Sequence, residues 1–275
     1  MPELPEVEVS RLGIAPKVEG QRIVAAILRA PRLRHDIPAE LATKLKGLRI
    51  DAIRRRGKYL LFDCESTRGG GWLILHLGMS GSLRFVPVGT PAQTHDHADL
   101  VFADIVLRLR DPRRFGTLVW HEGTSVESHP LLAVLGIEPL SEAFDGDWLY
   151  AATRGRQTPI KPFLMDSHRI VGVGNIYAAE SLFRAGISPT RAAGRISRTR
   201  CHTLASAVRA TLAEAIAAGG SSVRDYVHSD GGAGSFQLTC AVYGRYSLPC
   251  PNCGHSIAML RQAGRTTFHC PHCQR

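Results

Sequence analysis

Short runs of alternating hydrophobic and polar residues dominate the first 120 positions of the chain. Such runs, separated by turn residues, are typical of β-strands that bury one face. We expect strands over residues 22–30, 48–56, 59–64, 72–77, 82–86, 100–102, 105–110 and 117–120, with a helical turn at 41–45. Their close spacing favours a β-sandwich or barrel.

Helical spacing of hydrophobic residues occurs on both sides of this β-rich part. Leu4, Val7, Leu12 and Ile14 predict a first helix that runs up to Pro16, and Pro5 suits its first turn. A second helix should begin after Ser197 and stop at Gly219-Gly220, and a third should open in the glycine-rich stretch 172–180. Free backbone amides at that glycine-rich start, together with the Asn175 side chain, suit a phosphate group.

The basic charge of the chain is concentrated in its second half. The net charge is +10; residues 1–150 hold 19 Lys+Arg and 19 Asp+Glu, whereas residues 151–275 hold 15 and 5. This imbalance predicts a polyanionic partner, with nucleic acid favoured over an anionic membrane surface. No apolar run is long enough to span a bilayer, and nothing resembles a signal peptide, so we expect a cytoplasmic protein.

Four of the seven cysteines form two pairs near the end of the chain. Cys250, Cys253, Cys270 and Cys273 have the spacing C-x2-C-x16-C-x2-C. Two such pairs, brought together by a hairpin over 258–269, predict a closed tetrahedral Zn²⁺ site of structural type. The alternative is two disulfides, which a reducing compartment disfavours. Cys64 and Cys201 are expected to be buried, inert thiols.

The N-terminal residues Met1-Pro2-Glu3-Leu4-Pro5-Glu6 could carry chemistry. Removal of Met1 would leave Pro2 with a free secondary amine, and α-amino groups titrate near pH ~8, so part of this amine would be neutral and nucleophilic. The positive end of the first helix would favour the neutral amine and hold the carboxylates of Glu3 and Glu6. The alternative is an ordinary chain start whose acidic residues cap a helix.

Three turn-like stretches present unusual side chains. The basic corner 54–58 places Lys58 between two strands, either as a solvated strand end or as an active-site cation. The stretches 76–81 and 111–116 carry Met79 and Phe115, which either belong to the core or form a wedge into a stack of bases. His95 and His97 are expected in a polar surface loop.

Taken together, these stretches resemble the bacterial formamidopyrimidine-DNA glycosylases, which remove oxidised purines from DNA. The resemblance rests on Pro2 to Glu6, Gly57-Lys58-Tyr59, Asp111 to Gly116, Gly172 to Glu180, and the four-cysteine finger with Gly264-Arg265-Thr266-Thr267-Phe268. It covers essentially the whole chain. The sister family of endonuclease VIII type, which favours oxidised pyrimidines, usually has Gly in place of Leu4.

The resemblance implies an α+β multidomain fold: an N-terminal β-sandwich with flanking helices (1–128), a helix-two-turn-helix domain (129–238) and a zinc-finger β-hairpin (239–275). Pro2 would attack C1′ of the damaged nucleotide, and Glu3 would act as acid and base. Lys58 and Arg265 would be cations on the phosphates that flank the lesion. His76, Lys161 and Asn175 would bind the same phosphates. Met79, Arg113 and Phe115 would fill the gap left by the everted nucleotide, and residues 221–237 would hold a capping loop.

The implied reaction is excision of 8-oxoguanine and formamidopyrimidines from duplex DNA, followed by nicking of the abasic site through β- and δ-elimination. We expect a monomer that binds one structural Zn²⁺ and damaged double-stranded DNA, associated with the bacterial nucleoid through that DNA. Two alternatives stay open. An oxidised-pyrimidine glycosylase would differ in its substrates, and a zinc-ribbon DNA-binding protein without catalysis would leave Pro2, Glu3 and Lys58 without a role.

Overall fold

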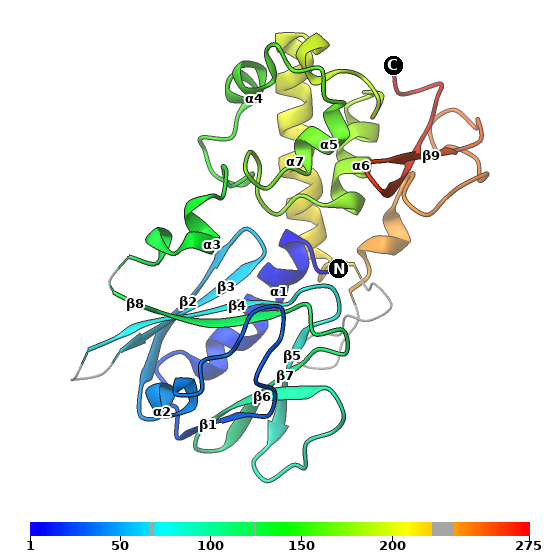
Figure 1. Cartoon of the computed structure of the whole chain (residues 1–275). Helices are drawn as coiled ribbons and strands as arrows, with labels where there is room; N and C mark the ends of the chain where they lie inside the picture. Colours follow the sequence, from blue (N-terminus) through cyan, green and yellow to red (C-terminus); the bar gives the residue numbers. More distant parts are fainter. Residues whose placement is uncertain (66–68, 124, 222–233) are drawn as a thin grey trace. The chain divides into compact units, whose positions relative to one another are not determined.

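The structure is a computed structural model of the whole chain, and it describes residues 1–65, 69–123, 125–221 and 234–275 (Figure 1). The chain divides into two compact units. Unit 1 comprises Met1–Ala133 and Gly219–Gly234, and unit 2 comprises Val134–Ala218 and Ser235–Arg275. The predicted capping loop lies largely outside the described residues, and the three domain boundaries expected from the sequence stay a prediction.

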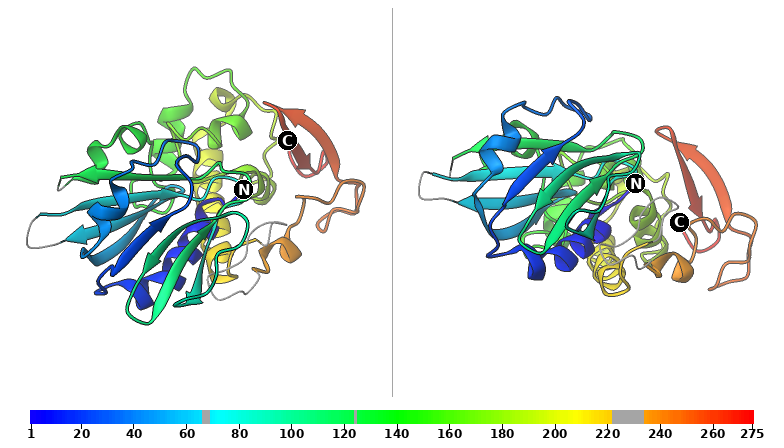
Figure 2. Two further views of the ribbon diagram at one scale, coloured as in Figure 1. Left: turned by 60° about the horizontal axis from the view of Figure 1, so that its bottom comes forward. Right: turned by 90° about the horizontal axis from the view of Figure 1, so that it is seen from below.

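Unit 1 contains two antiparallel four-stranded sheets that stack on each other (Figure 2). One has the order β2-β3-β4-β8, from Arg49–Arg56, Tyr59–Glu65, Gly71–His76 and Thr117–Glu122. The other has the order β1-β6-β7-β5, from Ala25–Leu28, Asp96–Val101, Ile105–Arg110 and Ser82–Pro87. Alternate side chains of both sheets, such as Phe62, Leu73 and Leu107, enter one hydrophobic core, which confirms the predicted sandwich.

Helix α1 (Leu4–Val18) packs against this core through Val7, Ile14 and Val18, at the spacing expected of a helix with one buried face. It continues two residues beyond Pro16, where the sequence predicted its end. The short helices α2 (Leu41–Leu45) and α3 (Pro130–Ala133) complete the α-helices of unit 1 among the described residues, and a 3-10 turn at Val126–Ser128 precedes α3.

The second sheet departs from expectation because charged residues are buried in it. Strand β6 begins at Asp96 rather than Leu100, and His97 is 4 % exposed, so its prediction as a surface-loop residue was wrong. The neighbouring carboxylates are neutralised: Arg108 Nε donates to Asp99 Oδ1 at 2.8 Å. Although burial opposes it, hydrogen bonds from Arg108 and Arg29 hold the pKa of Asp99 below its ordinary value.

Unit 2 combines four helices with a β-hairpin. The helices are α4 (Gly146–Thr153), α5 (Ile160–Leu164), α6 (Asn175–Arg184) and α7 (Arg198–Ala217), and the hairpin pairs β9 (Ala258–Gln262) with β10 (Arg265–His269). Helix α7 begins after Ser197, whose hydroxyl accepts the Arg200 N–H, and it ends just before Gly219-Gly220, as the sequence predicted. Short 3-10 turns at Ala193–Arg195 and Phe236–Thr239 lie in the connections of this unit.

No helix in the described parts of either unit has the length and apolar character needed to cross a membrane. Cys64 and Cys201 are buried, as predicted. Burial raises the pKa of both thiols, that of Cys64 to about 12, which favours the unreactive protonated form.

Candidate functional site

The N-terminus of α1 holds two buried carboxylates beside Pro2. Glu3 is the N-cap residue and forms a capping box with Glu6, in which the Glu3 N–H donates to Glu6 Oε2 at 2.7 Å. Glu3 is 3 % exposed and Glu6 is fully buried. The helix dipole favours negative charge at this end, so both carboxylates lie at the positive end of α1, as the sequence predicted.

Glu6 also reaches a segment far away in the sequence. Its Oε1 accepts the Ser221 N–H at 2.8 Å, and both residues belong to unit 1. Gly220 fits here because its φ is +77° and a Cβ atom would lie 3.1 Å from Glu6 Oε1. One carboxylate therefore fixes both the start of α1 and the first residue of the segment that would hold the predicted capping loop.

The basic corner between β2 and β3 is anchored by two of its arginines. Arg55 donates to Glu8 on α1 at 2.9 Å, and Arg54 lies over the Trp72 ring at 5.1 Å while pairing with Asp63. These contacts fix the corner to its surroundings. Lys58, in the turn after Gly57, is half-buried and lies close enough to His76 to act on its ionisation.

His76, at the end of β4, is a neutral hydrogen-bond donor in this environment. Its Nδ1 accepts the Gly78 N–H at 2.9 Å, so the ring proton resides on Nε2. Burial, followed by the charges of Lys58 and Arg34, lowers the pKa of His76 to about 4. A neutral ring can still donate from Nε2 to a phosphate oxygen, whereas the sequence had suggested a cation at this position.

This low pKa predicts an acid-sensitive contribution to stability. The folded-state pKa of His76 lies below its ordinary value, so the unfolded chain takes up a proton at a higher pH than the folded protein does. The contribution of His76 to the free energy of unfolding is therefore fully present above pH ~6.5 and is lost as the pH falls toward 4. Since the ring is partly exposed, we expect a loss of about 1–2 kcal/mol by pH ~5. Urea unfolding of wild type and His76→Gln at pH 7.5 and 5 would measure it.

The His76→Gln variant should lose less stability than wild type between these two pH values. The matched control is His168→Gln, which removes an exposed histidine and should behave like wild type. Equal losses in all three proteins would contradict the prediction.

Two loops of unit 1 expose the side chains that were predicted to act as a wedge. The first, Leu77–Gly81, follows β4 and carries Met79, which is 37 % exposed; the second, Asp111–Gly116, follows β7 and carries Phe115, which is 44 % exposed. The Arg113 guanidinium lies 5.0 Å from the centre of the Phe115 ring. Exposure of Met79 and Phe115 rules out the alternative that they are ordinary core residues within unit 1.

In unit 2, a buried lysine connects α5, α6 and the hairpin. Lys161 is 1 % exposed, and its Nζ donates to Asn175 Oδ1 at 2.6 Å and to Thr267 Oγ1 at 2.8 Å. Asn175 Nδ2 in turn donates to the Thr266 carbonyl at 3.0 Å. These bonds place the first turn of α6 beside β10 and leave a positive charge beneath the surface there.

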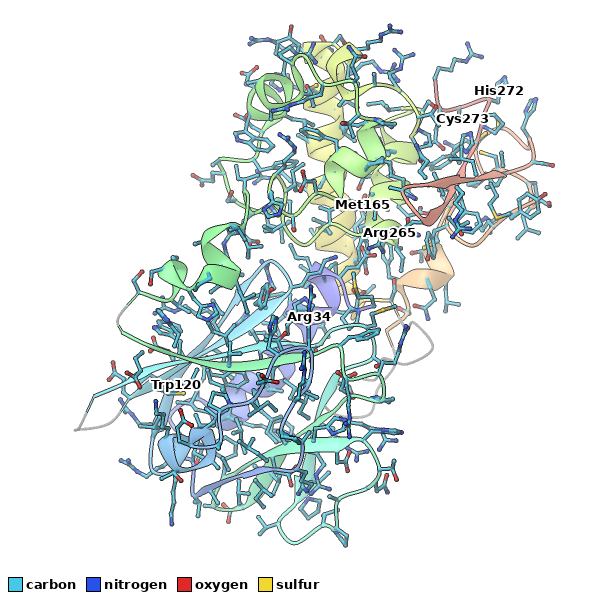
Figure 3. All side chains as sticks on the ribbon, in the orientation of Figure 1. Arg34, Trp120, Met165, Arg265, His272 and Cys273 are labelled. Atoms are coloured by element: carbon cyan, nitrogen blue, oxygen red, sulfur yellow. The ribbon has the colours of Figure 1, made fainter. Side chains whose placement is uncertain are left out.

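Arg265 lies at the tip of the hairpin (Figure 3), where it lines the same hollow as Lys161. Ala263 and Gly264 have φ values of +45° and +75°, the conformation of a two-residue hairpin turn, so β10 begins at Arg265 itself. A hollow of about 180 Å³ is lined by Lys161, Arg265, Thr267 and their neighbours. These two side chains suit an anionic group; that they bind a phosphate stays a prediction.

Glu180 binds the backbone of the segment that leads into the zinc finger, a role that the sequence did not predict. Its carboxylate is 2 % exposed and accepts the backbone N–H groups of Ala241, Val242 and Tyr243 at 2.8, 3.0 and 2.8 Å. Residues 176–183 of helix α6 are all buried, and a buried carboxylate nearly always accepts hydrogen bonds from within the protein. The helical pattern could therefore have indicated that Glu180 has a partner, but only the structure shows which backbone groups it binds.

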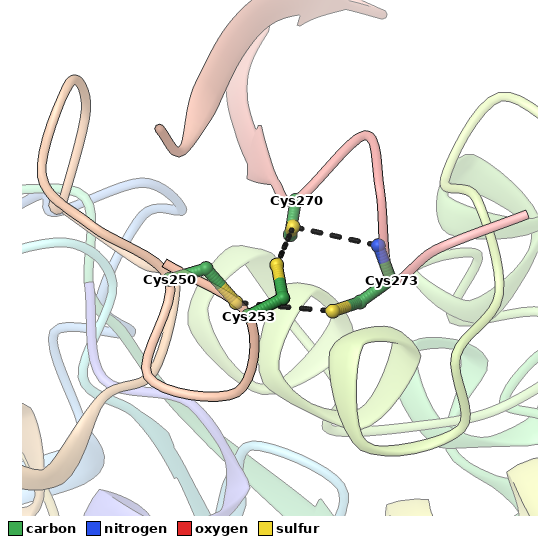
Figure 4. A group of neighbouring side chains, drawn as sticks. All are labelled: Cys250, Cys253, Cys270 and Cys273. Carbon is green, nitrogen blue, oxygen red and sulfur yellow. Dashed lines mark hydrogen bonds between the residues drawn. The ribbon is translucent and has the colours of Figure 1, made fainter. Parts of the chain in front are cut away.

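The four predicted zinc ligands are gathered at one point (Figure 4). Their sulfur atoms all lie within 4.8 Å of one another, and two of the distances are 3.9 Å for Cys250–Cys273 and 3.5 Å for Cys253–Cys270. A tetrahedral ion with Zn–S bonds of ~2.3 Å requires S–S separations of about 3.8 Å, whereas a disulfide requires ~2.05 Å. The donor set fits one structural Zn²⁺ and not two disulfides.

A second possible donor set at this point is less suited to a structural ion. Cys253, His255 and His272 also lie within reach of one another, but both imidazole rings are exposed and stack on each other at 4.3 Å. Cys250 and Cys270, in contrast, are buried with Val242 and Ile257 in a small core. The four-cysteine set, two of whose members are buried, is therefore better protected than the set that includes the two exposed imidazoles.

Comparisons with known proteins agree with this arrangement. Family models match residues 1–118 (formamidopyrimidine-DNA glycosylase N-terminal domain), 135–227 (formamidopyrimidine-DNA glycosylase H2TH domain) and 247–275 (zinc finger found in FPG and IleRS). The formamidopyrimidine-DNA glycosylase of Dechloromonas aromatica is 60% identical over 276 residues, covering 100% of both chains, and that of Ralstonia nicotianae is 53% identical over 288 residues, again covering 100% of both.

Solved structures give the same result. MutM (Fpg) from Thermus thermophilus is 41% identical and superposes with a TM-score of 0.88, covering 99% of this chain and 98% of that one. A Lactococcus lactis Fpg variant in complex with DNA containing Fapy-dG is 34% identical with a TM-score of 0.92, covering 100% of both chains. These likenesses extend over the whole chain, so the predicted fold is confirmed. The chain belongs to the formamidopyrimidine-DNA glycosylase family.

Proposed function

We propose that this protein excises oxidised purines, 8-oxoguanine and formamidopyrimidines, from duplex DNA and then nicks the resulting abasic site. The observation that carries the proposal is the buried Glu3 carboxylate directly after Pro2 at the positive end of the 15-residue helix α1. Family membership supports the glycosylase activity, and related Fpg structures contain DNA with a Fapy-dG lesion or an abasic site.

The first step uses the lone pair of the Pro2 amine. The nitrogen forms a bond to C1′, and the bond from C1′ to the damaged base breaks, with its electron pair and a proton leaving on the base. The C1′–O4′ bond then opens to give a C1′=N⁺ iminium, and Glu3 supplies the proton that O4′ takes up. Because a proline-derived iminium has no N–H, it stays cationic at every pH.

The cation then drives strand cleavage. It acidifies C2′, so removal of a C2′ proton expels the 3′ phosphate by β-elimination, and a further proton loss expels the 5′ phosphate by δ-elimination. Lys58, Arg265 and the neutral His76 would bind the flanking phosphates, with Lys161 and Asn175 supporting them. Met79, Arg113 and Phe115 would occupy the space left by the everted nucleotide, which reduces the free energy needed to extrude it.

Zinc has a structural role in this proposal. The four-cysteine site would hold the hairpin that presents Arg265, and it has no position for a substrate because all four ligands come from the protein.

Trapping of the iminium tests the mechanism. We expect borohydride reduction of the protein with a duplex carrying 8-oxoguanine opposite cytosine to give a covalent adduct that maps to Pro2. Intact mass spectrometry of the same preparation would establish that Met1 is absent. Pro2→Gly, which keeps a primary amine, should still be trapped but more slowly. An adduct on a lysine, or no adduct on protein that lacks Met1, would contradict the proposal.

The second candidate function is excision of oxidised pyrimidines. One observation favours them: wild-type Lactococcus lactis Fpg, 34% identical, has been solved with DNA containing an oxidised pyrimidine. A panel of duplexes with either class of lesion, compared by kcat/KM, would rank the two.

A further inference from the structure

The two loops that carry Met79 and Phe115 are in direct contact through their backbones. We call them the Met79 loop (Leu77–Gly81) and the Phe115 loop (Asp111–Gly116). Gly78, with φ of +64°, packs so tightly that a Cβ atom would lie 2.4 Å from the carbonyl carbon of Phe115. No side chain fits there, so the position of one loop limits the position of the other.

A buried polar bridge also joins the loops. Asp111 is fully buried, and its two carboxylate oxygens accept the Ser80 hydroxyl and the Gly116 N–H, each at 2.7 Å. Ser80, 3 % exposed, accepts the Arg113 N–H at 3.1 Å. Ser80 therefore connects the Met79 loop to both the start and the middle of the Phe115 loop.

The bridge is anchored to the sheet beneath it. His97 Nε2 lies 2.9 Å from the Asp111 carbonyl, and the Asp111 N–H donates to the His95 carbonyl at 3.0 Å. The side chains of Met79 and Phe115, in contrast, are exposed. Their positions thus depend on the backbone that Ser80 and Asp111 hold.

From this geometry we infer that Ser80 and Asp111 are positioning residues that hold Met79, Arg113 and Phe115 together as one preformed wedge. The inference rests on the proposed function. It assigns the bridge a role in everting the damaged nucleotide and not in the chemistry at Pro2. An abasic site needs little extrusion, so loss of the bridge should affect base excision much more than nicking of a preformed abasic site.

Ser80→Ala tests this separation. We expect single-turnover excision of 8-oxoguanine to slow by about tenfold, while nicking of an abasic-site duplex changes by less than about threefold. A 2-aminopurine next to the lesion should brighten when wild type binds, because the wedge unstacks it, and should brighten less with the variant. Ser181→Ala, the same change at a buried serine of α6, should match wild type in all three measurements.

Equal losses of excision and nicking, or no loss of either, would overturn the inference. If Ser80→Ala does not fold, Ser80→Cys keeps most of the volume with a weaker donor and should show the same separation to a smaller degree. Wild-type protein that neither excises nor nicks would refute the proposed function and, with it, this role for the bridge. A variant without the separation, on an active wild-type background, would refute the positioning role alone.

Discussion

Glu3→Gln is expected to slow base excision by roughly 10²- to 10⁴-fold while lesion binding stays within about threefold of wild type. The amide keeps the volume of the buried side chain and a carbonyl acceptor at the N-cap of α1, so the helix should form as before. It cannot transfer a proton to O4′ or accept one from C2′. Single-turnover excision and a gel-shift titration on the same lesion duplex would separate the two effects.

The matched control for this experiment is Glu40→Gln. Glu40 precedes α2 in unit 1; its side chain is exposed and makes no capping hydrogen bond to that helix. The substitution removes one negative charge from unit 1 without touching the N-terminus of α1 or the basic corner that carries Lys58, so excision should stay near the wild-type rate. Loss of both binding and excision in Glu3→Gln would instead assign Glu3 to the support of the fold, and full activity would remove it from the mechanism.

The sequence predicted those parts of the fold that local chemistry determines. Alternating residues placed most strands of the sandwich, and Ser197 and Gly219-Gly220 placed both ends of α7. Strand β6 was missed over its first residues because Asp96, His97 and Asp99 have the composition of a surface loop. The two carboxylates can be buried because Arg84 and Arg108, from strands β5 and β7, pair with them. A one-dimensional pattern does not show such partners.

For the candidate site, too, the sequence predicted what depends on neighbouring residues. The zinc ligands were evident because the two cysteines of each pair are separated by only two residues. The exposed Met79 and Phe115 were candidates because an apolar residue within a polar turn is unusual. The contacts that support the site were not predicted, because each joins segments that are far apart in the sequence: Glu180 with residues 241–243, Glu6 with Ser221, and Ser80 with Asp111.

Cys250→Ala is expected to remove the zinc ion and, with it, most affinity for DNA. Apparent zinc-binding free energies of such sites are ~10–16 kcal/mol, far more than a short hairpin gains from its own packing. Cys250 is also part of the small core with Ala179, Phe183 and Val242, so unfolding of the finger would expose one face of α6. Arg265 and the bonds from Lys161 to Thr267 would then lose their positions.

Metal analysis and DNA titration of the purified variant would test this chain of consequences. Zinc content should fall from one ion per chain to none, and 1,10-phenanthroline treatment of wild type should reproduce the loss of binding. His272→Gln provides the control, because this exposed ring lies beside the cluster but is not one of the four ligands; it should keep both zinc and affinity. A folded Cys250→Ala protein that binds DNA as wild type does would show that the finger contributes nothing to recognition, and the position of Arg265 would then need another explanation.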